Sequence, residues 1–174
     1  MSESERNRMF AQGAESSRVL LVWWKGMDQD RGGRAELRRA ATPTEVTFSP
    51  CFHRLLSRLL PEDDSPNAER ATNLAAIAGL AAHVKTNEEG ASFAEQMAAR
   101  KAPGSKNAKV GGLRFRRLLE VSDVNELYPL LIRVVRLLDR RVNLVSLANA
   151  VFWWNEKSKR DWAYAYYAKM PSEK

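Results

Sequence analysis

Apolar residues recur at helical spacing along most of the chain. After Ser49 and Pro50, a phenylalanine and several leucines repeat at intervals of three and four up to Leu60, which is typical of an amphipathic helix. Ser49 is a good N-cap, and Pro50 suits the first helical position, where a missing N–H costs nothing. Alanines are frequent between Asn67 and Val84. Because alanine favours helix, they predict a second helix, which a neighbour can approach closely.

Start signals mark further helices. Ser92 with Glu95 has the spacing of a capping box, in which each side chain satisfies a backbone N–H of the other residue, and Asp123 with Glu126 is predicted to cap another helix. The remaining predicted helices cover residues 2 to about 25, 35–40, 92 to about 100, 113–120, 123 to about 139, 143–154, and 158 or 159 to about 169.

Breaks and loops separate these helices. Gly32 and Gly33 are expected to interrupt the chain, residues 46–48 to form a short extended connection, and residues 101–112 to form a basic loop rich in glycine and proline. We find no alternating strand pattern. The fold class is therefore predicted to be all-α, with two small helical bundles packed together. The predicted domains are an N-terminal helical domain (1–102), a basic linker (103–112) and a C-terminal basic helical domain (113–174).

The charge is unevenly distributed. The 174 residues carry 28 Lys and Arg against 21 Asp and Glu, a net charge of +7. Residues 1–99 hold 12 basic and 14 acidic side chains, whereas residues 100–174 hold 16 and 7. A basic excess confined to one part of a folded chain favours a polyanionic partner, nucleic acid before an acidic membrane. The alternative is that the charge serves solubility alone.

Several protein classes are disfavoured. No apolar run approaches the ~18 residues of a membrane span, and the charged N-terminus lacks the order of a secretory signal. The only cysteine, Cys51, cannot form an intrachain disulfide, which favours a reducing compartment. We therefore expect a cytoplasmic protein without a membrane partner.

The sequence offers little for catalysis. Its two histidines, His53 and His83, lie on different predicted helices without a Cys or carboxylate at metal-ligand spacing, and such histidines are more often structural. Ser16, Ser17 and Cys51 lack any activating signature. We predict no catalytic residue, no metal and no cofactor, and hence no enzyme.

Arginines form the pattern most suggestive of binding. Arg133, Arg136 and Arg140 are spaced by three and four and would form one stripe on a helix. The preceding predicted helix carries Arg114, Arg116 and Arg117, and a second patch lies around residues 31–39, including Arg38 and Arg39. Guanidinium groups bind phosphate oxygens bidentately and stack on unpaired bases, which suits backbone contacts better than base readout. The alternative is a solvated face with local ion pairs.

Aromatic residues are paired or clustered. The tryptophan pairs Trp23–Trp24 and Trp153–Trp154 point about 100° apart on a helix. We therefore predict one ring of each pair in the core and the other half-exposed. The aromatics of the last helix, between Trp162 and Tyr167, are interpreted as core or subunit interface.

Together these motifs resemble a known family, the small subunit of the type I-E CRISPR Cascade complex (the CasB family). The resemblance is looser between residues 62 and 112. The residues that carry it are Trp24, Asp30 to Ala35, Leu37 to Arg39, Pro43, Glu45, Pro50 to Leu55, Arg114 to Leu119, Arg136 to Leu138, Leu147 to Trp154, Lys159, Arg160 and Trp162.

The resemblance implies a non-catalytic two-domain helical subunit. Its partners would be the CRISPR guide RNA, the target and displaced non-target DNA strands, other Cascade subunits, and a second copy packed head to tail. By position, the family's nucleic-acid contacts would fall on Arg39, approximately Lys85, Arg114, Arg117 and Arg136. Just after Leu118 and Leu119, relatives often carry further arginines, where this chain has Glu120 and Asp123. Arg116, Arg133 or Lys109 would substitute there.

Two other functions stay open at this stage. A helical transcription regulator would read duplex DNA through a helix-turn-helix. A protein–protein adaptor would instead use the aromatic last helix as its binding surface.

Overall fold

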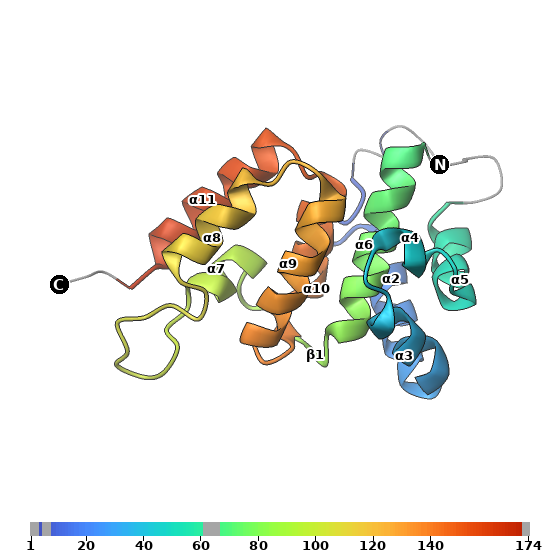
Figure 1. Ribbon diagram of the computed structural model, residues 1–174, viewed down its shortest axis with the longest axis horizontal. Helices are drawn as coiled ribbons and strands as arrows, with labels where there is room; N and C mark the ends of the chain where they lie inside the picture. The colour runs from blue at the N-terminus through green and yellow to red at the C-terminus, as the bar shows by residue number, and fades with distance from the viewer. Residues whose placement is uncertain (1–3, 5–7, 61–66, 172–174) are drawn as a thin grey trace.

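The computed structural model describes residue 4, residues 8–60 and residues 67–171, and it is built mainly of α-helices (Figure 1), which confirms the predicted all-α class. The helices are α2 (Glu15–Gly26), α3 (Arg31–Arg39), α4 (Pro43–Val46), α5 (Pro50–Leu59), α6 (Ala68–His83), α7 (Phe93–Ala98), α8 (Gly112–Glu120), α9 (Val124–Leu137), α10 (Leu144–Phe152) and α11 (Glu156–Lys169). A 3-10 turn, η1 (Met27–Gln29), follows α2.

Local capping explains where many helices begin. Ser49 caps α5 with Pro50 at its first position, as predicted. The Ser92–Glu95 capping box is also confirmed: the Glu95 N–H donates to Ser92 Oγ at 3.2 Å, and the Ser92 N–H donates to Glu95 Oε1 at 3.4 Å. Asn67 caps α6. The caps satisfy N–H groups that have no partner within the helix.

The helix predicted over residues 2 to about 25 is interrupted. Helix α2 starts only at Glu15, because Phe10 and Gly13 have left-handed backbone angles, with φ of 59° and 76°. The Phe10 N–H instead donates to Ser16 Oγ at 2.9 Å, which holds the preceding turn against the start of α2. The start predicted at Ser2 lies outside the described residues.

Two predicted breaks are wrong. Gly32 and Gly33 do not interrupt the chain but lie in the first turn of α3, where Asp30 Oδ1 accepts the Gly33 N–H at 3.0 Å. A Cβ on Gly33 would lie 2.4 Å from Asp30 Oδ2, so glycine permits this close cap. The extended connection predicted at 46–48 is also wrong at its start, since Thr42 caps the short helix α4, which ends at Val46.

The last two helices meet at a different residue from the one predicted. The start of α11 is at Glu156, because Asn155 Oδ1 accepts the Ser158 N–H at 3.0 Å. The preceding helix α10 ends at Phe152 rather than Trp154.

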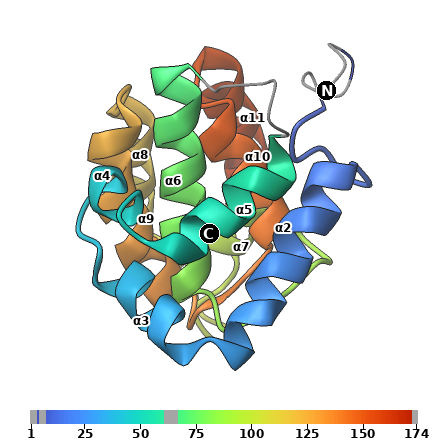
Figure 2. The same ribbon diagram turned by 90° about the vertical axis from the view of Figure 1, so that its right-hand side faces the viewer.

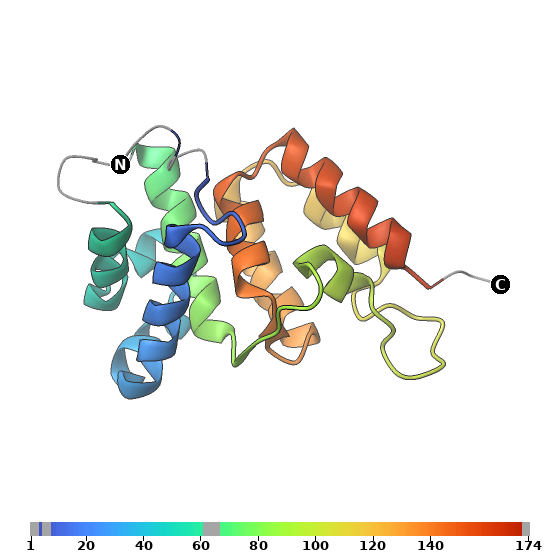
Figure 3. The same ribbon diagram turned by 180° about the vertical axis from the view of Figure 1, so that it is seen from behind.

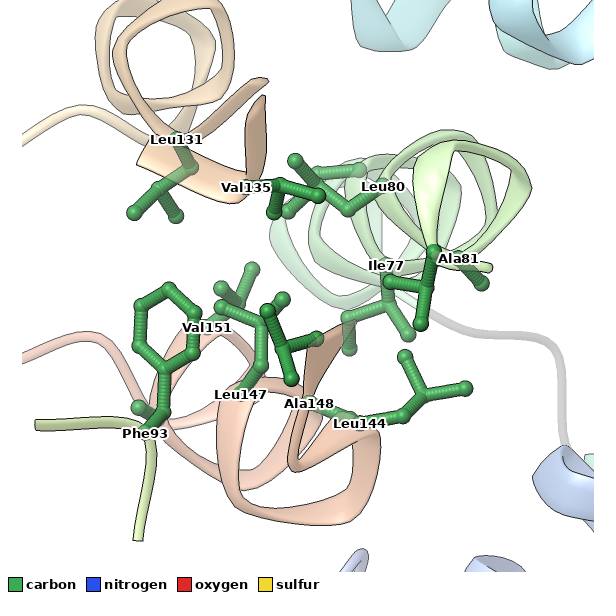
Figure 4. Close-up of a cluster of buried hydrophobic side chains, with 14 of the residues drawn as sticks. Ile77, Leu80, Ala81, Phe93, Leu131, Val135, Leu144, Leu147, Ala148 and Val151 are labelled. Carbon is green, nitrogen blue, oxygen red and sulfur yellow. The ribbon is translucent and has the colours of Figure 1, made fainter. Parts of the chain in front are cut away.

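Helix α6 is central in the fold. It packs on α3 and α4 on one side and on α9 and α10 on the other, so alanines on several of its faces are buried. Figure 4 shows apolar side chains from α6, α9 and α10 meeting, with Ile77 and Leu80 near Val135 and Ala148. One continuous core therefore spans both ends of the chain.

Two short strands pair beside α6 and connect the segment after α6 with the segment after α9. Strand β1 (Thr86–Asn87) pairs in parallel with β2 (Arg141–Val142), with Thr86 opposite Arg141. No alternating pattern predicts such two-residue strands.

The packing of α7 bears on the predicted domains. It contacts α11 and α10, and Figure 3 shows it beside these C-terminal helices. These contacts favour a division near β1, ahead of α7, rather than at 103–112. The division into domains itself stays a prediction.

Candidate nucleic-acid interface

The helices that carry the predicted basic residues lie on one side of the molecule. In Figure 1, α8 and α9 are on the near side, while α10 and α11 lie behind them. The view turned by 90° (Figure 2) shows α3, α4, α8 and α9 on the same side and α2 on the other, while Figure 1 shows that α3 and α8 lie apart along the long axis. Arginines on α3, α8 and α9 can therefore contribute to one surface.

The predicted site residues are accessible and carry uncompensated charge. Eight of the nine are exposed and Arg140 is half-buried. Among the described residues, none of the nine forms an ion pair with a carboxylate. The nine are Arg38, Arg39, Lys85, Arg114, Arg116, Arg117, Arg133, Arg136 and Arg140. The local ion pairs that a merely solvated face would form are therefore not found in this part of the chain.

Four arginines meet at the C-terminal end of α6, and we call Arg34, Arg38, Arg136 and Arg140 the central arginines. They come from α3, from α9 and from the turn after α9, and all four act electrostatically on His83 at the end of α6. Tertiary contacts thus unite two patches that are about 100 residues apart in the sequence.

Backbone hydrogen bonds fix part of this arrangement. The Arg140 carbonyl accepts the N–H groups of Lys85 at 2.8 Å and Thr86 at 3.1 Å, which places Lys85 beside the central arginines. Asp139 and Arg140 both have left-handed backbones, with φ of 55° and 59°. The turn is closed by the Arg140 N–H, which donates to the Val135 carbonyl at 2.9 Å.

Two central arginines differ in their environment. Arg34 is partly buried: its Nε donates to the Ala82 carbonyl at 3.2 Å, and its Nη1 pairs with Asp28 at 3.0 Å. It therefore holds the end of α6 in place. Burial, together with the nearby charges of Arg38 and Arg136, lowers the pKa of the Arg140 guanidinium. A bound anion would relieve this repulsion.

The arginines of α8 form a separate group. Phe115 points inward and stacks on Tyr166 with ring centroids 3.8 Å apart, which fixes the rotation of α8 about its axis. On an ideal helix Arg114 and Arg117 then lie on one flank and Arg116 on the other. Among the described residues, no ion pair involves this group.

The tryptophan pairs are structural. Trp23 and Trp154 are buried and their neighbours half-buried, as predicted. Each of the four indole N–H groups donates to a backbone carbonyl. These rings hold the chain together, and their N–H groups are already engaged.

Other kinds of site find little support. No group of three or more His, Cys, Asp or Glu among the described residues could hold a metal ion. In the same part of the chain, no helix has the length and apolar character needed to cross a membrane.

Fold and surface together define an all-α protein in which Arg38, Arg136 and Arg140 converge from separate elements and, among the described residues, lack a carboxylate partner. The family model for CRISPR-associated protein Cse2 matches residues 33–167. The chain therefore belongs to this CRISPR-associated family, as the motifs predicted.

A solved structure has the same fold. The chain is similar to one chain of a crystal structure of E. coli Cascade bound to a PAM-containing double-stranded DNA target, with 15% sequence identity and a TM-score of 0.63. The match covers 86% of this chain and 94% of that chain. No curated protein matches the sequence.

Proposed function

We propose that this chain is a non-catalytic subunit of an RNA-guided CRISPR surveillance complex that binds nucleic-acid backbone and stabilises the R-loop. R-loop formation exchanges a DNA duplex for a hybrid of similar stability, so a few phosphate contacts can decide the balance. Its partners would be guide RNA, both DNA strands and other Cascade subunits.

One observation carries this proposal. Arg38, Arg136 and Arg140 converge from separate elements without a carboxylate partner among the described residues. Holding like charges together is unfavourable unless an anion offsets them. Membership of the Cse2 family supports a polyanion in a CRISPR complex as that anion.

Charge removal tests the proposal. Arg38, Arg136 and Arg140 are replaced together by Gln, and target-DNA affinity of the assembled complex is measured over a range of salt concentrations. We expect an affinity loss on the order of tenfold to hundredfold and a salt dependence shallower by about two units, since each lost phosphate contact removes about 0.7–0.9. A second variant, Arg114→Gln with Arg117→Gln, tests the α8 group.

The control has the same loss of net charge elsewhere. Arg18, Arg54 and Lys157 are exposed and already paired with Glu15, Asp30 and Asp161. Replacing these three by Gln should leave the salt dependence unchanged. Equal slopes for the wild type and the variant with Arg38, Arg136 and Arg140 replaced would contradict the proposal.

We further propose that the two ends of the molecule contact neighbouring subunits, including a second copy head to tail. Phe48, beside α4 and α5, is 72% exposed, and Tyr164 on α11 is 74% exposed. These helices lie at opposite ends of the long axis (Figure 1). Exposed aromatic rings favour protein contacts.

Charged residues at these positions test the contact. Phe48→Asp and Tyr164→Lys should each reduce the number of copies that co-purify with the complex, because a buried charge is costly. The exposed residue Val22 on α2 provides a control, Val22→Lys. Unchanged stoichiometry in both variants would exclude these ends as interfaces.

A further inference from the structure

His83 is a buried polar side chain without a partner. It is the last residue of α6 and only 3% exposed. Neither Nδ1 nor Nε2 has a hydrogen-bond partner among the described residues. A neutral imidazole has one donor and one acceptor, and burying both without partners is unfavourable. Such a group calls for an explanation.

Hydrogen bonds place cations around this ring. Arg34 donates to the carbonyls of Ala82 and Val84, on either side of His83. Arg38 lies one helical turn after Arg34 on α3, and so on the same flank. On the other side, the carbonyl of Arg140 accepts N–H groups from Lys85 and Thr86.

Burial and the surrounding charge keep the ring neutral. Burial, and then the cations Arg136, Arg38, Arg140 and Arg34, lower the pKa of His83 to about 4. A histidine at a helix C-terminus would ordinarily be favoured in its charged form by the helix dipole. The central arginines and burial therefore outweigh the dipole.

We propose that Arg38, Arg136 and Arg140 bind a backbone phosphate and that His83 near them takes up a proton when they do. This inference rests on the proposed function. The phosphate's negative charge offsets the cations, so the free ring nitrogen accepts a proton from solvent, and no covalent bond changes. The buried ring then carries a charge balanced by the ligand, which makes the site a proton-coupled phosphate subsite.

The coupling has a defined sign. Because the bound state holds one more proton than the free state, affinity increases as the pH falls through the pKa of the bound state. If a bound phosphate raises that pKa by about two units, the affinity of the wild type should increase about tenfold more between about pH 7 and pH 5 than that of a variant without this ring.

The first experiment concerns the free full-length chain. With only His53 and His83 in the sequence, the imidazole ¹³C NMR signals can be assigned through a His53→Gln variant. Arg136→Gln removes the cation with the largest effect on His83 and should raise the midpoint of His83 by at least about half a unit. The matched control is Arg133→Gln. Arg133 lies one turn earlier on α9 and is not among the cations that lower the pKa of His83. Equal midpoints in the two variants would overturn the arrangement.

The second experiment uses the assembled complex. Target-DNA affinity is measured between about pH 5 and pH 8 for the wild type and for His83→Leu, with His83→Gln as a second variant if assembly fails. The inference expects the pH-dependent increase in the wild type only. The same pH dependence in both proteins, with the salt effect of the central arginines intact, would contradict the inference but not the proposed function. Loss of that salt effect would contradict both.

Discussion

At the scale of single residues, His83 has a measurable thermodynamic consequence. Its pKa is about 4 in the fold, against an ordinary 6.5, so the unfolded chain binds more protons between these values. The contribution of neutral His83 to the free energy of unfolding is therefore fully present above about pH 6.5 and is lost as the pH falls towards 4. The loss from this group is roughly 3 kcal/mol.

Replacing the ring tests this prediction. His83→Leu removes the titrating group and the two unpartnered nitrogens. Between pH 7 and 4, the free energy of unfolding should therefore decrease by roughly 3 kcal/mol less in the variant than in the wild type. Urea unfolding at several pH values measures the difference. His53→Gln retains His83 and should keep the wild-type loss. Parallel pH profiles for wild type and His83→Leu would show that the ring does not titrate as described.

At the scale of elements, one close approach locks α9 across α6. The Tyr128 hydroxyl on α9 donates to the Ala40 carbonyl at 3.2 Å, beyond the end of α3. It passes Gly79 on α6, where a Cβ would lie 2.3 Å from the hydroxyl oxygen. Burial raises the pKa of Tyr128 to about 12, so the hydroxyl stays protonated and can donate. Glycine at 79 thus allows α9 to be held close to the end of α3, and these two helices carry most of the central arginines.

A methyl group at this position should break the lock. Gly79→Ala is expected to lower the free energy of unfolding by about 2–3 kcal/mol, because the added carbon displaces Tyr128. Gly26→Ala in α2, where nothing lies within 4 Å, is the control and should be neutral or slightly stabilising. Combining Gly79→Ala with Tyr128→Phe should cost less than the sum of the two changes. Full additivity would mean that the two residues do not compete for the same space.

At the scale of the whole molecule, the shared core predicts cooperative unfolding. Side chains of α6, α9 and α10 pack in one cluster (Figure 4), so neither part of the chain can bury its apolar surface alone. Unfolding in urea should give coincident transitions by circular dichroism and tryptophan fluorescence. Hydrogen exchange should yield similar opening free energies for α6 and α9. An earlier, separate opening of α9 to α11 would instead indicate two independent domains.

Prediction from the sequence worked where local signals decide the structure. Ser49 with Pro50 and Ser92 with Glu95 satisfy backbone groups within one turn, so the starts of α5 and α7 were predictable. Prediction failed where the backbone adopts a conformation that the pattern does not indicate. Phe10 has a left-handed backbone, which interrupts the helix predicted over residues 2 to about 25. At Gly33, the Asp30 cap turns an expected break into the start of α3.

The sequence by itself determined the helical class, the unequal charge and the family, because periodicity, capping residues, composition and ordered motifs are all local properties. Only the tertiary structure decided that Arg38, Arg136 and Arg140 lie near one buried histidine, where their charges lower its pKa. That arrangement depends on the packing of α3 and α9 on α6 and on the Arg140 turn bonded to Lys85. Spacing along a chain cannot report distances between helices that are brought together by a shared core.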